Sequence, residues 1–479
     1  MAQVSAKVPD KFNVLLIGGG GREHAIALAL KKSPRLAALY TSHPENPGLA
    51  AVAMPVDVPI SIREIYRLQQ FMEKKAINLV VIGPEDPLAE GFTDKLASST
   101  CLVFGPTKDG AQLEADKAWC KQLLRSASVP TGEGRVFSDP EAARGYLESR
   151  CVDDPALAAL LTRADEHPDP QDRRKFIERE VWQKKELAAA YEKPRPSLPV
   201  IKATGLAKGK GVILPATLKE ALQAIEEIMV RRVFGDAGRQ VLIEEKLTGA
   251  EVSVLAITDG SSILMLPPAQ DHKRLGDGDT GPNTGGMGAF CPADTLDEKT
   301  MRTVERDVLV PTLDALRRDG IDYKGVLYAG LMLTHAGPKV LEFNCRFGDP
   351  ECQAILSRLD SDLLELIIAS CTGTLAECEV RWKSDAACTV VIAAEGYPEK
   401  PKTGVPIHGL EDAARVPGVT IYHAGTKRDA VGHIVTGGGR VLAVTGLGKD
   451  VNDARAKAYE ACSKISFPGM VMRSDIGGR

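Results

Sequence analysis

A strand, a run of four glycines and a helix follow one another near the start of the chain. In "NVLLIGGGGREHAIALAL" the apolar run Val14–Ile17 leads into Gly18–Gly21, and a helical pattern begins at Arg22. This order requires a tight turn at the carboxyl end of a buried strand, and it predicts an open α/β sheet. The first N–H groups of a helix lack intrahelical partners and lie at the positive end of the dipole. The turn is therefore a candidate phosphate site.

A dinucleotide cofactor is disfavoured at this turn. Its fingerprint places a third glycine where the helix packs on the strand. This chain has Glu23 or His24 there, depending on the first glycine counted. The fingerprint also needs an acidic residue after the second strand, whereas Thr41–His43 follow the expected second strand. The phosphate should therefore belong to another ligand.

Length and composition limit the remaining possibilities. A chain of 479 residues is too long for one core and predicts about three domains. A net charge of −4 and an aromatic content of 5% argue against a nucleic-acid partner. No apolar run is long enough to span a bilayer, and "MAQVSAKVPDKF" lacks an apolar signal core, so we expect no membrane association. Ten scattered cysteines favour buried thiols in a reducing compartment, and the expected location is the cytoplasm.

The two ends of the chain show different patterns. Strands expected at residues 13–17, 36–40, 79–82 and 101–104 form a small parallel-sheet domain over residues 12–106. Loops follow three of these strands, at Gly18–Gly21, Glu45–Gly48 and Gly83–Leu88. Open α/β sheets bind ligands at such carboxyl ends of their strands. Residues 386–479 show mostly strands and turns with one helix near 454–465, which predicts a β-rich C-terminal domain.

Residues 150–198 differ from the rest of the chain. Their sequence is rich in mixed charge and is bracketed by prolines. We expect two short helices and linkers that form a solvated appendage. Partner docking and a simple tolerated insertion are both open as roles for this segment.

A lysine next to a glycine-rich loop suits a nucleoside triphosphate. In "VIKATGLAKGKGV" Lys202 lies on an expected strand, and Gly205, Gly209 and Gly211 form a mobile loop beyond it. The ammonium neutralises phosphate charge, and the loop N–H groups wrap the phosphate chain. The pattern is not a Walker A loop, and a plain surface hairpin is the alternative.

A second stretch, "LIEEKLTGAEVS", places three acidic residues on or near strands. Glu244, Glu245 and Glu251 stand among apolar residues, although such acids usually form a solvated face. The backbone at Glu245–Leu247 is a candidate partner for an adenine edge, and a carboxylate is a candidate partner for ribose hydroxyls.

Two further stretches carry polar residues in unusual density. In "KVLEFNCRFGDPE" the side chains of Glu342, Asn344 and Arg346 point to one face of a strand. Hard oxygen ligands suit Mg²⁺, and an arginine beside them stabilises a transferring phosphoryl group. Residues Gln270–Phe290 contain six glycines; a disordered loop is one reading, but loops of this length in compact domains tend to be functional.

These motifs together resemble the phosphoribosylamine–glycine ligase family of the ATP-grasp superfamily. The motifs that carry the resemblance occur in family order: "GGGGREHA", "GPEDPL", "FGPTKDGAQLEADKA", "IKATGLAKGKGV", "QDHKRLGDGDTGPNTGGMGA" and "EFNCRFGDPE". The resemblance implies an α/β (α+β) chain with an ATP-grasp domain at residues 107–385. That domain would contain a lid subdomain at about 130–248 and would lie between a Rossmann-like N-terminal domain and the β-rich C-terminal domain.

The resemblance also implies substrates and residue roles. Glycine and 5-phospho-D-ribosylamine would be joined with ATP, with Mg²⁺ or Mn²⁺ as the metal. Glu342 and Asn344 would be metal ligands, and Arg346 and Lys202 catalytic residues. The implied ATP-binding residues are Lys117, Lys202, Gly205, Gly209, Gly211, Glu244, Glu245, Leu247 and Glu251. The implied substrate-binding residues are Gly19, Gly20, Gly21, Asn46, Gly48, Glu85, Asp271, Lys273, Asn283, Gly285, Gly286, Arg346 and Asp349.

Two departures from the family stand out. Thr204 occupies a position where the family usually has Asp, and the family lacks most of residues 150–198. Two other functions remain open: another ATP-grasp ligase or a carboxylase acting on bicarbonate, and a nucleotide-binding regulatory protein without catalysis. The sequence leaves a monomer and a homodimer equally open.

Overall fold

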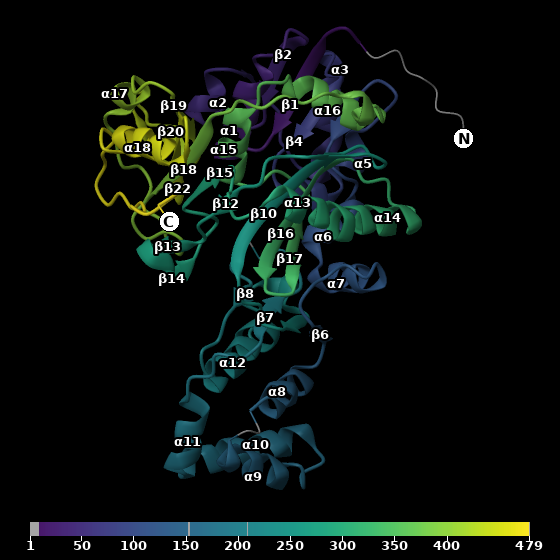
Figure 1. Ribbon diagram of the computed structural model, residues 1–479, viewed down its shortest axis with the longest axis vertical. Coiled ribbons are helices and arrows are strands. Elements are labelled where there is room, and N and C mark those ends of the chain that lie inside the picture. The colour runs from purple at the N-terminus through teal and green to yellow at the C-terminus, as the bar shows by residue number, and fades with distance from the viewer. Residues whose placement is uncertain (1–8, 152–153, 208, 479) are drawn as a thin grey trace. The chain divides into compact units, whose positions relative to one another are not determined.

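The computed structural model describes residues 9–151, 154–207 and 209–478. The chain divides into two compact units (Figure 1). The first contains the residues up to 114, residues 123–130 and the residues from 249 onward, and the second contains residues 115–122 and 131–248.

A parallel five-stranded sheet forms the N-terminal part of the first unit, with the strand order β3-β2-β1-β4-β5. The strands are β1 (Phe12–Ile17), β2 (Leu36–Thr41), β3 (Met54–Pro55), β4 (Leu79–Ile82) and β5 (Leu102–Phe104). The helices are α1 (Gly21–Leu30), α2 (Pro47–Ala50), α3 (Ile65–Lys74), α4 (Glu85–Glu90) and α5 (Phe92–Leu96). The four strands expected from the sequence are all present, because they are mostly apolar runs whose residues are largely buried.

An antiparallel four-stranded sheet follows in the same unit, with the order β11-β10-β16-β17. Its strands are β10 (Ala250–Thr258), β11 (Ile263–Met265), β16 (Gly325–Thr334) and β17 (Gly337–Asn344). The helices of this region are α6 (Lys108–Ala115), α13 (Glu298–Val304), α14 (Val310–Arg318), α15 (Glu351–Arg358) and α16 (Leu363–Thr372). Strands β16 and β17 form a hairpin, with Tyr328 opposite Asn344 and Thr334 opposite Gly337.

The C-terminal residues complete a third sheet, with the order β12-β15-β18-β22-β19. Its members are β12 (Gln270–Asp271), β15 (Gly288–Cys291), β18 (Ala386–Ala393), β19 (Val419–His423) and β22 (Arg440–Gly448). The hairpin β20 (Thr426–Arg428) and β21 (Ile434–Thr436) and the helices α17 (Leu410–Ala414) and α18 (Val451–Cys462) accompany it. Two of the five strands therefore come from the glycine-rich stretch and not from residues 386–479.

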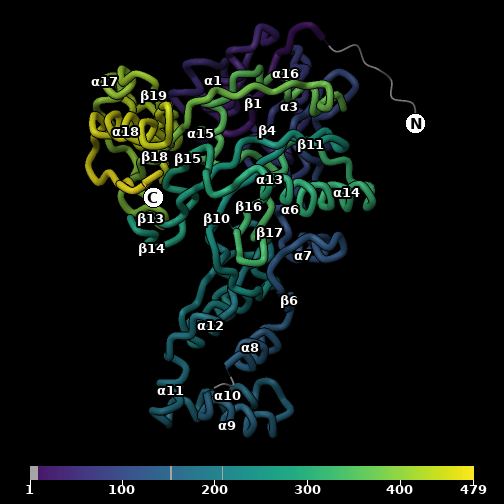
Figure 2. The backbone as a smooth tube through the Cα atoms, in the orientation of Figure 1, coloured from purple at the N-terminus to yellow at the C-terminus, as the bar shows by residue number. Residues whose placement is uncertain are grey.

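The rest of that glycine-rich stretch is ordered as well. Strands β13 (Arg274–Gly276) and β14 (Thr280–Asn283) form a hairpin. In Figure 2 this hairpin lies beside the C-terminal end of the chain, and Arg473 NH1 lies 2.9 Å from Asp279 Oδ1. The reading of this stretch as a disordered loop is therefore wrong.

The second unit is built on an antiparallel sheet with the order β6-β9-β7-β8. The strands are β6 (Gly134–Phe137), β7 (Val200–Ala203), β8 (Val212–Ile213) and β9 (Val241–Glu244). Helix α7 (Lys117–Ser126) begins in this unit, and α8 (Pro140–Ser149) and α12 (Leu218–Ile225) supply buried residues to its core. A π-helical segment, Glu226–Val230, continues α12.

The expectation of two short helices in a solvated appendage is wrong. Residues 154–198 contain three helices: α9 (Pro155–Ala164), α10 (Pro170–Gln183) and α11 (Lys185–Glu192). Their buried residues belong to the same apolar cluster as the sheet residues of this unit: Leu157, Leu160, Leu161, Ala164, Ile177, Leu187, Ala190 and Tyr191. The prolines mark helix starts, because Asp154 and Asp169 cap α9 and α10 with Pro at the first helical position.

Within the described residues, no helix combines the length and the apolar character that crossing a membrane requires. All ten cysteines lie in this part of the chain, and none forms a disulfide.

Candidate active site

Two lysines share one buried carboxylate in the second unit. Lys202 on β7 faces the end of the neighbouring strand β9, and its Nζ lies 2.5 Å from Glu244 Oε2. Lys121 on α7 donates to Glu244 Oε1, to Thr131 Oγ1 at 2.6 Å and to Gly132 O at 2.9 Å. Burial lowers the pKa of Lys121, and Glu244 opposes that shift. Two ammonium groups around one carboxylate leave net positive charge, which suits phosphate oxygens.

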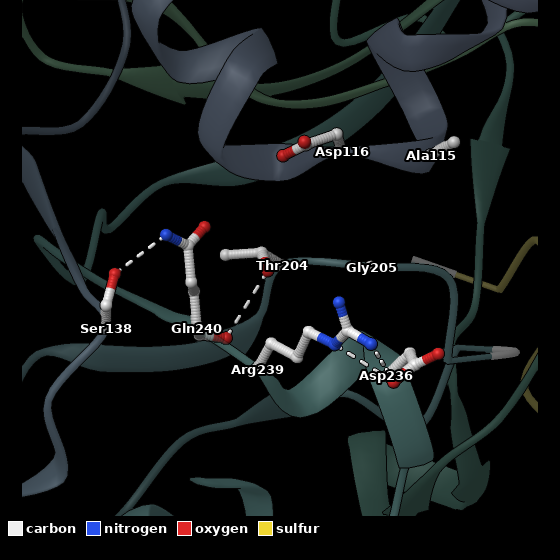
Figure 3. A pocket seen from close by; sticks show the side chains of 8 residues that line it. All are labelled: Ala115, Asp116, Ser138, Thr204, Gly205, Asp236, Arg239 and Gln240. Carbon is white, nitrogen blue, oxygen red and sulfur yellow. Dashed lines mark hydrogen bonds and ion pairs between the residues drawn. The ribbon is translucent and has the colours of Figure 1, made fainter.

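Lys117 is tied to the glycine loop of the same unit. Its backbone N–H donates to Thr204 O at 2.8 Å, and its Nζ donates to Gly205 O at 3.3 Å. A pocket of about 440 Å³ lies beside this segment and is lined by Asp116, Thr204, Gly205 and Gln240, among others (Figure 3). The structure thus places Lys117 next to the loop predicted to hold the phosphate chain.

The departure at Thr204 has a local consequence. Its hydroxyl donates to Gln240 O at 3.4 Å, and its N–H donates to the same oxygen at 3.3 Å (Figure 3). A carboxylate at this position could only repel that carbonyl oxygen, because it carries no proton to donate. Gly205 is needed here for close packing, since a Cβ would lie 2.7 Å from Ala237 Cα.

The segment after β9 is more exposed than the buried carboxylate. Glu245 is exposed and Leu247 is partly buried. The Glu245 N–H donates to Glu133 O at 2.6 Å, and its carboxylate accepts from the Glu133 N–H at 3.2 Å. This part of the adenine segment is therefore held against β6, and the role predicted for it stays a prediction.

A second charged group lies in the first unit. Lys273 Nζ lies 3.5 Å from Glu251 Oε2 and 3.6 Å from Glu342 Oε1. Burial raises the pKa of Asp271 to about 7, although Lys273 opposes the shift. Burial alone would lower the pKa of Lys273, but Asp271, Glu342 and Glu251 raise it. These four residues therefore interact as one electrostatic group, although the sequence predicted Glu251 for ATP, Asp271 and Lys273 for the substrate, and Glu342 for the metal.

Behind this group lies a buried network that the sequence reasoning missed. Tyr328 on β16 donates to Glu351 Oε1, and Ser253 Oγ lies 2.8 Å from Tyr328 Oη and 3.2 Å from Glu351 Oε1. Burial and the Glu351 charge raise the pKa of Tyr328, so its hydroxyl stays a donor. No local pattern marks these residues, because they meet from three separate elements.

Glu342 and Asn344 share a strand face on β17, as their spacing predicted. Their oxygens are the hard donors that Mg²⁺ prefers, and Glu342 already attracts the Lys273 ammonium. This donor set fits a divalent cation shared with phosphates. No cluster of three or more His, Cys, Asp or Glu side chains that could hold a metal occurs in the described parts of the chain.

Arg346 is engaged by two carboxylates of the first unit. Its NH2 lies 2.8 Å from Glu114 Oε1 and its Nε lies 3.2 Å from Glu85 Oε2. The same NH2 donates to Asn344 Oδ1 at 3.3 Å, so the guanidinium does reach the face that carries the predicted metal ligands. Burial would lower the pKa of Arg346, but Glu114 and Glu85 raise it.

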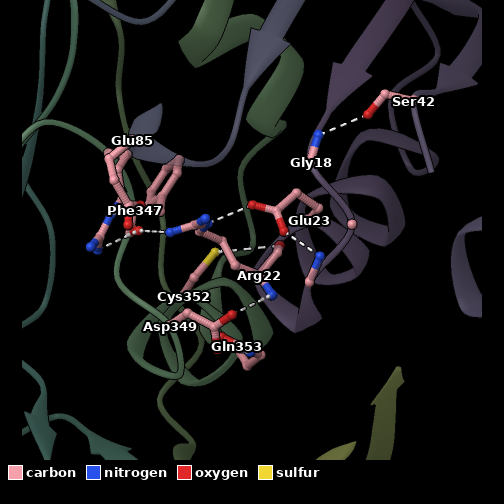
Figure 4. Close-up of polar contacts among 12 residues, drawn as sticks. Gly18, Arg22, Glu23, Ser42, Glu85, Phe347, Asp349, Cys352 and Gln353 are labelled. Carbon is pink, nitrogen blue, oxygen red and sulfur yellow. Dashed lines mark hydrogen bonds and ion pairs between the residues drawn. The ribbon is translucent and has the colours of Figure 1, made fainter. Parts of the chain in front are cut away.

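The backbone N–H groups of the glycine turn at the start of α1 already form hydrogen bonds within the protein. Three backbone N–H groups donate to side chains: Gly18 to Ser42 Oγ (2.9 Å), Gly20 to Glu23 Oε2 (2.6 Å) and Arg22 to Asp349 Oδ2 (3.3 Å) (Figure 4). A phosphate at this turn would have to compete with these bonds. Glu23 stands where a dinucleotide fold needs glycine, because its carboxylate caps the helix and also accepts from Arg22 Nε.

Both the nitrogen and the oxygen of the Asn46 side chain form hydrogen bonds within the protein. Its Nδ2 donates to Gly19 O at 2.9 Å and His423 O at 3.0 Å, and its Oδ1 accepts from the Gly48 N–H at 2.9 Å. The residue is 2% exposed. Gly48 packs against His24, where a Cβ would lie 2.3 Å from Cε1. The structure explains both residues by packing, and their contact with substrate stays a prediction.

Two further predicted substrate residues, Gly285 and Gly286, lie near Asp349. Arg440 NH1 lies 3.5 Å from Asp349 Oδ1 and donates to Gly285 O at 2.7 Å. Burial raises the pKa of Asp349, but Arg440 and Arg22 hold it below its usual value. Gly286 lies against Pro350, with φ +112° and no room for a Cβ. Asn283 lies apart from these on β14, paired with Arg274.

Comparison with known proteins gives three matches to one set of family profiles. They are the N domain of phosphoribosylglycinamide synthetase at residues 12–114, its ATP-grasp (A) domain at 176–352 and its C domain at 387–479. A phosphoribosylamine–glycine ligase of Rhodopirellula baltica is 44% identical over 471 residues and covers 98% of both chains. The trifunctional purine biosynthetic protein adenosine-3 of Gallus gallus is 43% identical, over 97% of this chain and 42% of its own length.

Solved structures agree with these matches. The crystal structure of a phosphoribosylamine–glycine ligase from Thermotoga maritima has a TM-score of 0.74 and 29% identity, and covers 97% of this chain and 100% of its own. A biotin carboxylase domain from Hydrogenobacter thermophilus shares the fold alone, with a TM-score of 0.65 and 14% identity over 97% and 92% of the two chains.

The antiparallel sheets, the glycine loop and the buried lysines define an ATP-grasp protein. The chain belongs to the phosphoribosylglycinamide synthetase family. The expected family, the expected ATP-grasp fold and the expected class of ATP-dependent ligase are therefore confirmed.

Proposed function

We propose that the chain joins the carboxylate of glycine to the amine of 5-phospho-D-ribosylamine at the expense of ATP. The products are glycinamide ribonucleotide, ADP and phosphate, the second step of purine synthesis. The observation that carries this proposal is the match to all three family domains in order, together with a relative named for this reaction over nearly the whole chain.

The reaction needs two chemical steps, because the carboxylate of glycine is a poor electrophile. A glycine carboxylate oxygen attacks the γ-phosphorus of ATP, the bond to the β–γ bridging oxygen breaks, and ADP leaves. The amine of phosphoribosylamine then attacks the acyl carbon of glycyl phosphate. The carbon–nitrogen bond forms, phosphate leaves, and the amine gives up a proton. The protein mainly positions the reactants and neutralises charge.

The residue roles are assigned from the two charged groups, one around Glu244 and the other around Lys273. Lys117 and Lys202, with the loop glycines, bind the ATP phosphates, and Lys121 joins them because it shares Glu244 with Lys202. Glu251 binds the ribose hydroxyls of ATP. The metal, Mg²⁺ or Mn²⁺, would be held by Glu342 and Asn344 and would neutralise phosphate charge there.

The substrate side uses the first unit. The Gly19–Gly21 turn and Glu85 bind the sugar phosphate, and Asp271, Lys273 and Asp349 with the Asn283–Gly286 segment bind the reacting groups of the substrates. Arg346 stabilises the charge on the phosphoryl group while it is transferred, since its guanidinium reaches Asn344.

One assay tests the proposal against its alternatives. ADP release is measured with glycine plus phosphoribosylamine, with bicarbonate, and with no acceptor. The proposal requires ADP release that depends on both glycine and phosphoribosylamine. Release that depends on bicarbonate would instead support a carboxylase, and nucleotide binding without release would support a regulatory protein.

The expected compartment is a reducing one, and we propose the cytoplasm. All ten cysteines remain outside disulfides, which suits such a compartment. The partners of the proposed reaction are small molecules.

A further inference from the structure

A cavity in the second unit lies among helices to which no part of the reaction has been assigned. It has a volume of about 170 Å³ and is lined by residues of α8, α10, α11 and α12. Two of these helices, α10 and α11, lie in residues 154–198, for which the sequence predicted no role in the reaction. None of the residues predicted for catalysis, ATP or substrate lines it.

One buried hydroxyl in this cavity has no partner. Tyr191 on α11 is 7% exposed, and its Oη makes no hydrogen bond among the described residues. A buried polar atom without a partner costs free energy and is rare in native proteins. Burial raises the pKa of Tyr191, and Glu148 adds to the shift, so the hydroxyl keeps its proton. The cavity therefore offers two buried donors that need acceptors, the Tyr191 hydroxyl and Arg144 Nε, since neither makes a hydrogen bond among the described residues.

The charges around the cavity are balanced and already paired. Three arginines and three glutamates line it. The closest pairs are Arg144 with Glu226 at 2.7 Å, Arg173 with Glu148 at 2.9 Å and Arg174 with Glu178 at 2.9 Å. A charged ligand would have to break one of these pairs, so the cavity favours a neutral ligand.

The remaining walls favour a flat ring. Ile177, Val181 and Leu222 give apolar surface, and Trp182 beside them is 89% exposed. An exposed indole presents a face for stacking on another aromatic ring. A cavity of about 150 Å³ binds benzene in another protein, so a space of about 170 Å³ holds one ring or two fused rings.

We propose that this cavity binds a neutral, planar, nitrogen-containing aromatic molecule of nucleobase size. A ring nitrogen accepts the hydrogen bond from Tyr191, and the ring lies between the apolar wall and Trp182. Exocyclic N–H groups face the glutamates at the edge of the cavity. Such a ligand would join α10 and α11 to α8 and α12, and so stabilise the unit that carries Lys202. The inference does not depend on the ligase reaction.

Adenine is the first probe. Titration into the full-length protein, without glycine or phosphoribosylamine, is followed by tryptophan fluorescence and by calorimetry. We expect saturable binding that quenches Trp182. Tyr191→Phe keeps the ring and should weaken binding about three- to tenfold, the usual effect of one hydrogen bond. Trp182→Ala should abolish the quench, and Lys175→Ala, an exposed position on the same helix, should change nothing.

Three further ligands test the chemistry by calorimetry. Indole has no ring nitrogen acceptor and should bind more weakly than adenine. Adenosine should bind like adenine if its sugar points to solvent, whereas AMP should bind more weakly because its phosphate meets only paired arginines. Absence of saturable adenine binding, equal affinity in Tyr191→Phe, or tighter binding of AMP than of adenine would each overturn the proposal.

Discussion

Lys202 Nζ lies 2.5 Å from Glu244 Oε2, and Lys121 donates to the other oxygen of the same carboxylate. All three side chains are buried, and Glu244 is 3% exposed. The carboxylate thus holds together two cations that would otherwise repel each other in a medium of low dielectric. This relationship gives Glu244 a structural role in addition to the ATP contact predicted for it.

Glu244→Gln should destabilise the second unit by about 3–5 kcal/mol, the scale for breaking a buried ion pair. The amide retains one acceptor, but its NH₂ group faces an ammonium. Hydrogen exchange of the β7 and β9 amides measures the change in this unit directly. Glu245→Gln, one residue further and exposed, is the matched control and should leave the exchange unchanged. Equal exchange in the two variants would remove the stabilising role of Glu244.

Glu342→Gln should raise the Mg²⁺ concentration needed for half-maximal ADP release. The amide offers one oxygen but loses the charge that holds a divalent cation. Glu251→Gln is the matched control, because both carboxylates lie at nearly the same distance from Lys273 Nζ, 3.5 and 3.6 Å. The control should raise the KM for ATP and leave the Mg²⁺ titration unchanged. A Mg²⁺ titration that is identical in wild type and Glu342→Gln would show that Glu342 is not a ligand.

Much of the fold follows from local sequence patterns. Strands β1, β2 and β4 can be recognised in the sequence as apolar runs. The β16–β17 hairpin can be recognised as well, because each of these elements depends on neighbouring residues. Pairing between distant segments is not visible in this way. Strand β15 pairs with β18 across about a hundred residues, and no local pattern indicates that partner.

The candidate site residues divide in the same way, into those that a local pattern indicates and those that depend on a distant partner. The motif lysine Lys202 and the acidic strand face were found from spacing and residue type. Lys121 was missed because its partner Glu244 lies 123 residues away, and Glu114 was missed because Arg346 lies 232 residues away. The helices of residues 154–192 were misjudged for another reason: abundant charge concealed the apolar spacing of Leu157, Leu160, Leu161 and Ala164.

Leu160→Ala should destabilise the second unit by about 2–5 kcal/mol, because it opens a cavity in a packed core. Leu160 on α9 belongs to the same apolar cluster as Ile201 and Ile243 of the sheet. Hydrogen exchange of β7 and β9 reports whether α9 supports the sheet. Lys175→Ala on the exposed side of α10 is the control. Normal protection after deletion of residues 154–193 would restore the view of this segment as an appendage.

The first unit should lose stability in acid through His24. Burial, with a smaller effect of His423, lowers the pKa of His24 to about 3. Its Nδ1 accepts from the His423 N–H at 2.9 Å, so protonation breaks that bond. Because the folded pKa lies below the unfolded value, the contribution is complete above about pH 6.5 and is lost as the pH falls toward 3.

Between pH 7 and pH 5 this histidine should remove about 2 kcal/mol from the free energy of unfolding. Urea denaturation at the two pH values measures it, as the difference between wild type and His24→Gln. His433→Gln, at an exposed position, should keep the wild-type dependence. A His24→Gln variant with an unchanged pH dependence would contradict the assignment.

The structural contacts of Arg346 can be separated experimentally from the catalytic role proposed for it. Its guanidinium contacts Glu114, Glu85 and Asn344. Burial raises the pKa of Glu114, and Arg346 opposes that shift. Arg346→Ala therefore removes the cation that keeps a buried carboxylate charged, and it should lower the melting temperature.

The same substitution should lower kcat by about 10²–10³-fold, or about 3–4 kcal/mol, the scale for one donor to a developing charge. ATP affinity should change much less, because Lys117 and Lys202 remain, and Arg346→Lys should recover only part of kcat because it lacks the planar fork. Adding Glu114→Gln to Arg346→Ala supplies a neutral partner and should restore the melting temperature while kcat stays low. If kcat recovers together with stability in this double variant, Arg346 acts only by holding Glu114, and the phosphoryl-transfer role is lost.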